Sequence, residues 1–242
     1  MLLAADEVDV WRAALDPAAG VQTDLEQSLD ATERDRARRF LLTCHRRRFI
    51  VAHAVLRLLL AGYCRCSPQE LRFAAGPWGK PSLLEPASDL CFNISHSGEM
   101  ALYALTRNAD IGVDIEHRRA RLAGDDIAAR YFAAEEVSAL HALPSHRRTE
   151  AFFRCWTRKE AFIKARGEGL LLPLHSFVVS LAPEPPEGLL SIDGSAAAAA
   201  EWSLSGLPVP AGYTAALAVK ARGRRLTIRD WHHDSAGYTG VS

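Results

Sequence analysis

Apolar and polar positions alternate in several short stretches of the chain, which is the pattern of half-buried β-strands. In the first half of the sequence these stretches cover residues 8–11, 91–95, 100–105 and 111–116. A short turn containing Gly98 separates the second from the third, so we expect a β-hairpin there. Similar strand-like stretches follow in the second half, at residues 176–181, 189–192, 202–204, 213–219 and 226–231.

Helical periodicity fills the long segments between these strands. An apolar face every three to four residues predicts a helix over about 46–60, and Ser28 or Asp30 is a suitable N-cap for a shorter, arginine-rich helix before it. The segment 148–166 has no Gly or Pro, and Gly167 follows where helices often end in a left-handed residue. We expect shorter helices at 125–131 and 134–143, and a loop at the alanine run 196–200.

The order of strand, helices and strands occurs twice, once before about residue 110 and once after it. This predicts an α+β fold in two comparable halves, residues 1–110 and 111–242. Sequence similarity between the halves is too weak to establish a repeat by spacing alone.

Composition places the chain among ordinary globular proteins, at 242 residues with 48% hydrophobic and 24% charged positions. Lys+Arg and Asp+Glu are both 29, so net charge does not direct the protein to nucleic acid or membrane. The charge is uneven, because seven arginines and a single acid, Asp35, lie between residues 34 and 48 (Arg34, Arg36, Arg38, Arg39, Arg46, Arg47, Arg48). We expect a local positive field there.

Targeting signals and cysteines point to the cytoplasm. The five cysteines include no CxxC pair, which argues against a zinc site or a disulfide framework and for a reducing compartment. The first residues lack the basic region of a secretory signal. The most apolar run, residues 51–60, contains His53 and Arg57 and is too short to span a bilayer.

Asp114 and Glu116 form the first candidate constellation. Two positions apart on a strand, they point to the same face and lie about 6.6–6.8 Å apart along the chain. Paired carboxylates repel one another unless a cation or a proton joins them. Mg²⁺, which prefers a few carboxylates together with substrate phosphates, suits such a pair. The alternative is a strand face whose acids point into water.

On the helix after residue 148, Trp156, Glu160 and Lys164 follow at intervals of four and lie along one stripe. Glu160 could be a third metal carboxylate, with Lys159 and Lys164 complementing phosphate. Alone, Glu160 and Lys164 are also a favourably ordered surface ion pair, stabilising the helix by ~0.2–0.5 kcal/mol. Trp156 is expected mainly to pack.

Ser95 and His96 are adjacent at the end of a strand, so their side chains point to opposite faces and cannot act as nucleophile and base for one another. A phosphate contact suits His96 better, and a polar cluster that stabilises the turn is the alternative. Arg48 on its helix could hold phosphate through its planar fork, although a charged helix face explains most of its neighbours. Lys80, in a Gly/Pro-rich loop, means little by itself.

Three motifs stand in order along the chain: Phe92-Asn93-Ile94-Ser95-His96-Ser97, Ile111-Gly112-Val113-Asp114-Ile115-Glu116, and Trp156-Thr157-Arg158-Lys159-Glu160-Ala161-Phe162-Ile163-Lys164. Together they resemble the 4'-phosphopantetheinyl transferases, of the larger, surfactin-synthetase-activating (Sfp-like) type. The similarity covers about half of the chain, from Gly79-Lys80-Pro81 to Gly169, with a fainter extension through Arg48. It implies two similar halves packed as a pseudo-dimer, with the active site at their interface and coenzyme A contacts in the N-terminal half.

The resemblance also implies a reaction, in which the phosphopantetheine arm of coenzyme A moves to a serine of an apo acyl or peptidyl carrier protein and adenosine 3',5'-bisphosphate leaves. It implies that Asp114, Glu116 and Glu160 hold Mg²⁺ or Mn²⁺, and that Glu160 helps to remove the serine proton. Lys164 would contact the pyrophosphate and assist the leaving phosphate, with Lys159 nearby. Contacts with the adenosine part of coenzyme A would come from Arg48, Lys80, Ser95 and His96.

The nucleophile would then belong to the carrier, which fits the lack of a convincing nucleophile and base in the chain. Carriers of fatty-acid, polyketide and nonribosomal-peptide synthesis are acidic, and the arginine cluster could steer them toward the enzyme. We expect a cytoplasmic monomer with no nucleic-acid or membrane partner. Two alternatives are a metal-dependent hydrolase of the coenzyme A pyrophosphate and a non-catalytic module that binds carrier proteins.

Overall fold

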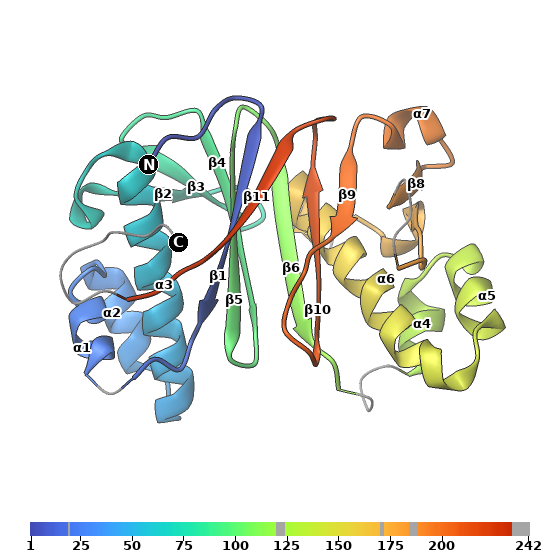
Figure 1. Cartoon of the computed structure of the whole chain (residues 1–242), viewed down its shortest axis with the longest axis horizontal. Coiled ribbons are helices and arrows are strands. Elements are labelled where there is room, and N and C mark those ends of the chain that lie inside the picture. Colours follow the sequence, from blue (N-terminus) through green and yellow to red (C-terminus); the bar gives the residue numbers. More distant parts are fainter. Residues whose placement is uncertain (19, 120–123, 170–171, 184–187, 234–242) are drawn as a thin grey trace. The chain divides into compact units, whose positions relative to one another are not determined.

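The structure is a computed structural model that describes residues 1–18, 20–119, 124–169, 172–183 and 188–233 (Figure 1). The chain forms two compact units. Unit 1 contains residues 1–74, 81–108 and the described part from Arg225 onward, and unit 2 contains residues 75–80 and 109–224. Each unit has helices and a sheet of its own, which confirms the predicted α+β class.

The main sheet of unit 1 has the strand order β11-β1-β5-β4. It consists of β1 (Glu7–Ala14), β4 (Leu90–Ser97), β5 (Met100–Arg107) and β11 (Arg225–Asp230). Strands β4 and β5 pair antiparallel as the predicted hairpin, with Ser97 opposite Met100. Gly98 opens the two-residue turn at a φ of 58°, in the left-handed region where glycine is favoured.

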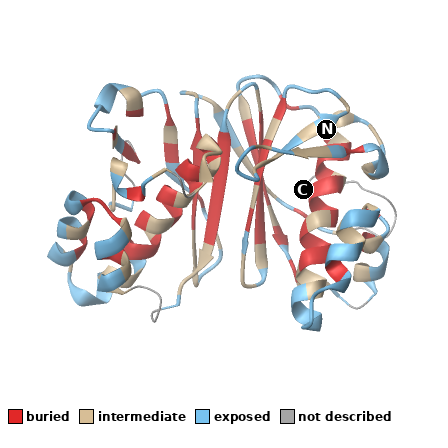
Figure 2. Cartoon of the chain, turned by 180° about the vertical axis from the view of Figure 1, so that it is seen from behind, coloured by how far each residue is buried: buried red, intermediate tan, exposed pale blue. Residues whose placement is uncertain are grey.

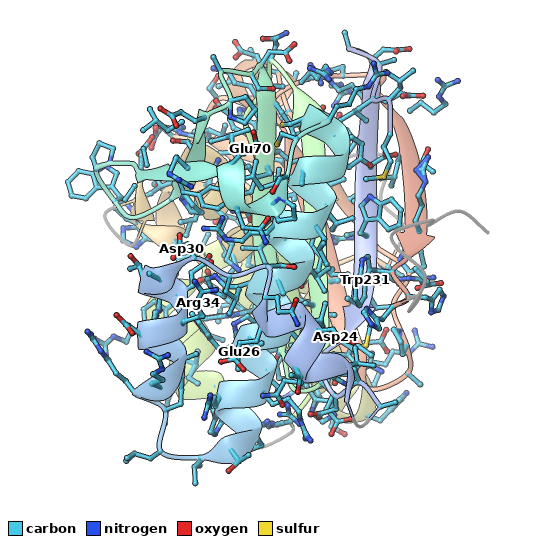
Figure 3. All side chains as sticks on the ribbon, turned by 90° about the vertical axis from the view of Figure 1, so that its left-hand side faces the viewer. Asp24, Glu26, Asp30, Arg34, Glu70 and Trp231 are labelled. Carbon is cyan, nitrogen blue, oxygen red and sulfur yellow. The ribbon has the colours of Figure 1, made fainter. Side chains whose placement is uncertain are left out.

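Helices α1 (Val21–Glu26), α2 (Ala31–Arg38) and α3 (Thr43–Cys64) cover one face of this sheet (Figure 1). Asp30 caps α2 in a capping box with Glu33, as one of the two predicted caps, and Arg34 follows one turn later (Figure 3). Buried residues run along α3 toward the sheet and form the core of unit 1 (Figure 2). A short 3-10 helix, η1 (Pro68–Glu70), and the strand pair β2 (Arg72–Ala75) and β3 (Pro81–Glu85) complete the unit.

Strand β11 joins unit 1, although the sequence-based division at residue 110 assigned it to the second half. It pairs parallel with β1, from Glu7 opposite Arg225 to Arg12 opposite Asp230. Arg12 donates to Asp230 at 2.7 Å, and Arg229 donates to Asp9 at 3.2 Å. Long-range pairing of this kind leaves no signal in the local alternation of residues.

The sheet of unit 2 has the order β6-β10-β9, with β6 (Ile111–His117), β9 (Ser203–Gly206) and β10 (Tyr213–Val219). The long helix α6 (Ser145–Arg166) lies along it, with α4 (Asp125–Tyr131) and α5 (Ala134–Ala142) near its N-terminal half (Figure 1). A 3-10 helix η4 (Leu174–Ser176), the strands β7 (Phe177–Val179) and β8 (Leu189–Ile192), and α7 (Ala196–Ala199) follow. Gly167 ends α6 in a left-handed conformation, as predicted.

The alanine run is helical and not the expected loop. Ala196–Ala199 forms α7, and the Ser195 hydroxyl accepts a hydrogen bond from the backbone N–H of Ala198. Alanine has the highest helix propensity, and with a serine cap even one turn of it becomes a helix.

In the part of the chain that the structure describes, no helix is long and apolar enough to cross a membrane. The five cysteines are free, and only Cys155 is fully buried. This agrees with the expectation that the cysteines form no disulfide framework.

Candidate active site

A close approach between α6 and β6 builds the site in unit 2. A Cβ on Gly112 would lie 2.1 Å from the carbonyl oxygen of Ala161 and 2.3 Å from the amide nitrogen of Ala165. Only glycine allows the helix backbone to rest on the strand at this distance. Since Gly112, Asp114 and Glu116 share one face of β6, the two acids point to the side on which α6 lies.

Three carboxylates gather where α6 crosses β6. Asp114 is 2% exposed, and Glu116 and Glu160 are partly buried. Burial raises the pKa of Glu160, the negative charges of Asp114 and Glu116 raise it further, and Lys164 opposes them. The helix and strand that were predicted separately therefore bring the three predicted acids within electrostatic reach of one another.

Lys164 lies beside Asp114 and not only beside Glu160 on its own helix. Its Nζ donates to Oδ1 of Asp114 at 2.6 Å, and the side chain is 29% exposed. Lys164 thus pairs with an acid of another element and also opposes the charge of Glu160 on its own helix, one of the two interpretations of the sequence. These four groups combine one positive and three negative charges.

The carboxylates are near one another but are not drawn together into a metal cage. Within the described ranges, no group of three or more His, Cys, Asp or Glu side chains is arranged to hold a metal ion. Lys164 contacts one oxygen of Asp114. The oxygen-only donor set and the crowding that raises the pKa of Glu160 both fit a hard divalent cation.

Lys159 does not lie with these acids. It is 0% exposed, and its Nζ contacts the carbonyl oxygens of Leu174 at 2.7 Å and Phe177 at 2.8 Å and a carboxylate oxygen of Glu136 at 2.8 Å. An ammonium group has three donors, so all three are used. These contacts leave no donor of Lys159 for the expected contact with coenzyme A. Lys159 faces away from the acids because one step along a helix turns a side chain by about 100°.

Lys80 fastens the end of α6. Its Nζ donates to the carbonyl oxygens of Ala165 at 2.8 Å and Ile111 at 3.0 Å. A cation is favourable at the C-terminus of a helix, where carbonyl groups have no partner within the helix. The lone loop lysine of the sequence is therefore engaged in packing β6 against α6, and this limits what it can offer a ligand.

An apolar cavity of about 200 Å³ lies beside Glu116, lined by Ile127, Phe152, Phe153 and Trp156. Trp156 stacks on Phe152, with ring centroids 6.2 Å apart, and meets Tyr131 edge to face at 6.0 Å. These contacts agree with the expectation that Trp156 packs. The cavity was not predicted from the sequence, because its walls come from α4 and α6.

The remaining candidates belong to unit 1. Ser95 is buried and His96 exposed on β4, so the two side chains face opposite ways, as predicted for adjacent strand residues. Arg48 on α3 donates to Asp16 at 2.7 Å and to Glu99 at 3.3 Å. Its guanidinium lowers the pKa of Asp16, so this pair is charged. Sequence reasoning missed Asp16 and Glu99, which lie 32 and 51 residues from Arg48.

Comparison with known proteins covers both units. A family model described as the 4'-phosphopantetheinyl transferase superfamily matches residues 110–218, and one described as the N-terminal part of a 4'-phosphopantetheinyl transferase matches residues 16–108. The 4'-phosphopantetheinyl transferase HetI of Nostoc sp. is 35% identical over 235 residues, which cover 96% of this chain and 95% of HetI. The chain belongs to the 4'-phosphopantetheinyl transferase superfamily.

A second relative of this superfamily is the 4'-phosphopantetheinyl transferase Sfp of Bacillus subtilis. It is 34% identical over 149 residues, which cover 62% of this chain and 65% of Sfp. These matches confirm the family and the enzyme class expected from the three motifs. Asp114, Glu116 and Glu160 lie within the residues that the superfamily model matches.

Proposed function

We propose that this enzyme transfers the 4'-phosphopantetheine arm of coenzyme A to a serine of an apo acyl or peptidyl carrier protein and releases adenosine 3',5'-bisphosphate. The observation that supports this most strongly is the carboxylate cluster. Glu160 lies close enough to Asp114 and Glu116 for their charges to raise its pKa, and Lys164 lies at the same place. Such a cluster suits a reaction that needs charge neutralisation on phosphate groups.

Asp114, Glu116 and Glu160 are the residues we propose to hold Mg²⁺, with Mn²⁺ as a substitute. A divalent ion bound here would neutralise and orient the pyrophosphate of coenzyme A. Asp114, fixed on β6 and 2% exposed, offers a rigid ligand, while Glu116 and Glu160 are more accessible. When the pyrophosphate arrives, Lys164 exchanges its contact with Asp114 for a phosphate oxygen.

Glu160 is also our candidate for accepting the proton of the attacking serine, directly or through a water molecule. Its carboxylate is partly exposed and lies near Asp114 and Glu116, so it could reach the serine hydroxyl next to the reacting phosphate. Lys164, whose side chain is 29% exposed, assists the departing bisphosphate. The chain then needs no nucleophile of its own.

In unit 1 we propose that Arg48, Ser95 and His96 contact the adenosine bisphosphate part of coenzyme A. His96 is exposed, and Arg48 is held in a charged pair that a phosphate group could join or replace. Lys80 in unit 2 is a further candidate contact of the adenosine bisphosphate part. We expect the enzyme to act as a cytoplasmic monomer, and size-exclusion chromatography tests the monomer.

The deciding experiment incubates the protein with coenzyme A, Mg²⁺ and an apo carrier protein and then measures the intact mass of the carrier. We expect a gain of one phosphopantetheine group per carrier serine. Glu160→Gln and Asp114→Asn should lower the rate by at least about 10²-fold while the fold remains, since each removes a ligand of the proposed metal that neutralises the reacting phosphate. The absence of any mass gain across fatty-acid, polyketide and nonribosomal-peptide carriers would refute the transferase.

Two other functions make different predictions in the same assay. A hydrolase of the coenzyme A pyrophosphate would release adenosine 3',5'-bisphosphate without any carrier protein. A non-catalytic module would bind carriers as well after Glu160→Gln as before it. Omitting the carrier and measuring carrier affinity of the variant therefore separate the three functions.

A further inference from the structure

A buried ion pair lies on the side of α6 away from the carboxylate cluster. Lys159 and Glu136 of α5 are 0% and 1% exposed, with Nζ and Oε2 separated by 2.8 Å. Burying two charges is unfavourable unless every remaining donor and acceptor is satisfied. A buried ion pair is therefore weak evidence for a role in stability, and another role can be asked of it.

Both members are fully bonded. Glu136 accepts from the backbone N–H of Ala133 at 2.7 Å and from that of Val179 at 2.7 Å. Lys159 donates to the carbonyl oxygens of Leu174 and Phe177, and its ammonium lies 4.4 Å from the centre of the Phe177 ring. The pair thus ties three segments together: the start of α5, the middle of α6 and the stretch from η4 to β7.

These contacts fix the rotation of α6. On the other side of the helix, Gly112 lets the backbone at Ala161 and Ala165 rest directly on β6. Contact with the strand sets the distance of the helix, but a helix can still turn or slide on a flat contact. An ammonium held by three acceptors allows neither, because each of its hydrogen bonds has a narrow range of length and direction.

We propose that Lys159, together with Glu136, is a positioning residue that holds Glu160 at the angle and height where its carboxylate faces Asp114 and Glu116. Glu160 is the next residue on the helix, so a rotation that Lys159 resists would carry Glu160 away from the other acids. The inference rests on the proposed function, because it assigns Lys159 to the geometry of the proposed metal carboxylates. Lys159 contacts neither coenzyme A nor metal.

The test uses the double variant Lys159→Met/Glu136→Gln in the full chain. It removes both buried charges while keeping similar volume, and the new amide oxygen can still accept from one of the two backbone N–H groups that Glu136 binds. The matched control is Arg57→Met/Glu33→Gln, which removes from unit 1 another ion pair, between the fully buried Arg57 and the partly buried Glu33, with Nε and Oε2 2.6 Å apart. Circular dichroism establishes which variants are folded.

The main measurement is Mn²⁺ affinity, from the electron paramagnetic resonance signal of free Mn²⁺ at saturating coenzyme A. We expect the double variant to bind Mn²⁺ roughly 10-fold or more weakly, as when groups that orient metal ligands are removed. Its kcat should fall with little change in KM for the carrier, whereas the control should keep wild-type Mn²⁺ affinity and kcat. Wild-type affinity and kcat in the folded double variant would show that the pair only stabilises the fold.

If the double variant does not fold, Lys159→Arg decides. It keeps the positive charge beside Glu136, but a planar guanidinium cannot bond to the same three acceptors, so α6 must shift. We expect weaker Mn²⁺ binding, and unchanged binding would overturn the proposal. Failure of the proposed function gives a different result. In that case the wild-type protein and Glu160→Gln would bind Mn²⁺ equally weakly or not at all.

Discussion

Lys159 and Glu160 are neighbours in the sequence, yet the two faces of α6 give them opposite surroundings. Lys159 is 0% exposed and meets one carboxylate and two carbonyl oxygens, so its charge is matched. Glu160 is partly exposed, and the charges of two further carboxylates raise its pKa in addition to burial, while Lys164 lowers it. On one face the charges are matched within the protein, and on the other we propose that an additional cation binds.

The difference teaches that the type of residue does not decide its role. Lys159 and Lys164 both lie on α6 five positions apart, and both could complement phosphate as far as the sequence shows. Their donors decide: those of Lys159 are used within the protein, whereas Lys164 is 29% exposed and contacts an acid of the cluster. The surroundings of each ammonium thus separate a lysine bonded within the protein from the one that we propose to contact phosphate.

Replacing each lysine with methionine tests whether the two lysines have different roles. Lys159→Met leaves Glu136 buried without its partner, and we expect a loss of about 3–5 kcal/mol in the free energy of unfolding. Lys164→Met removes a partner that is 29% exposed from the buried Asp114, so we expect a smaller loss, about 1–3 kcal/mol, while transfer is strongly slowed. Chemical denaturation and the carrier assay measure both, and similar stability losses would contradict the distinction.

The second test concerns the close contact between α6 and β6 at Gly112. In Gly112→Ala the added methyl group meets backbone atoms of α6, which cannot turn aside as a side chain can. We expect a loss of about 1–3 kcal/mol, toward the upper end, together with weaker metal binding because the helix is pushed away from Asp114.

Gly188→Ala is a matched control, because its added Cβ would also meet backbone, 2.1 Å from the carbonyl oxygen of Leu204, away from the carboxylates. It should cost similar stability but leave the affinity for Mn²⁺ unchanged. If Gly112→Ala bound the metal as wild type does, the close approach would have no part in forming the site.

Much of the fold could be predicted because its signals are local. The hairpin of β4 and β5, the cap at Asp30 and the left-handed end of α6 at Gly167 all depend on neighbouring residues. The pairing of β11 with β1 could not be predicted, since it joins residues 218 positions apart. Of the proposed site, the three acids were predicted from spacing and motif together, and the structure brings them near one another.

What the sequence missed were partners distant along the chain. Glu136, which bonds to Lys159, is 23 residues away on another helix and has an ordinary place in an amphipathic pattern. Asp16 and Glu99 likewise gave no sign that they meet Arg48. A single sequence shows which residues carry charge, whereas tertiary structure shows which charges are already matched.

The smallest expected effect concerns the stability of the metal-free protein, and it would sharpen the contrast between the two faces. The pKa of Glu160 in the folded state is raised above its usual 4.5. As pH rises, the unfolded state therefore loses the proton of this carboxyl at a lower pH than the folded state does. Glu160 therefore lowers the stability progressively as pH rises from about 4.5 through its raised pKa, and Glu160→Gln should remove this loss.

Urea unfolding in the presence of a chelator, from pH 4 to 8, measures the effect. We expect Glu160→Gln to match the wild type at the acidic end and to become the more stable protein toward neutral pH, while it loses transfer activity. Adding Mg²⁺ with coenzyme A should stabilise the wild type and not the variant. Equal stability at every pH would mean that the three carboxylates do not act on one another, and the proposed metal site would lose its main support.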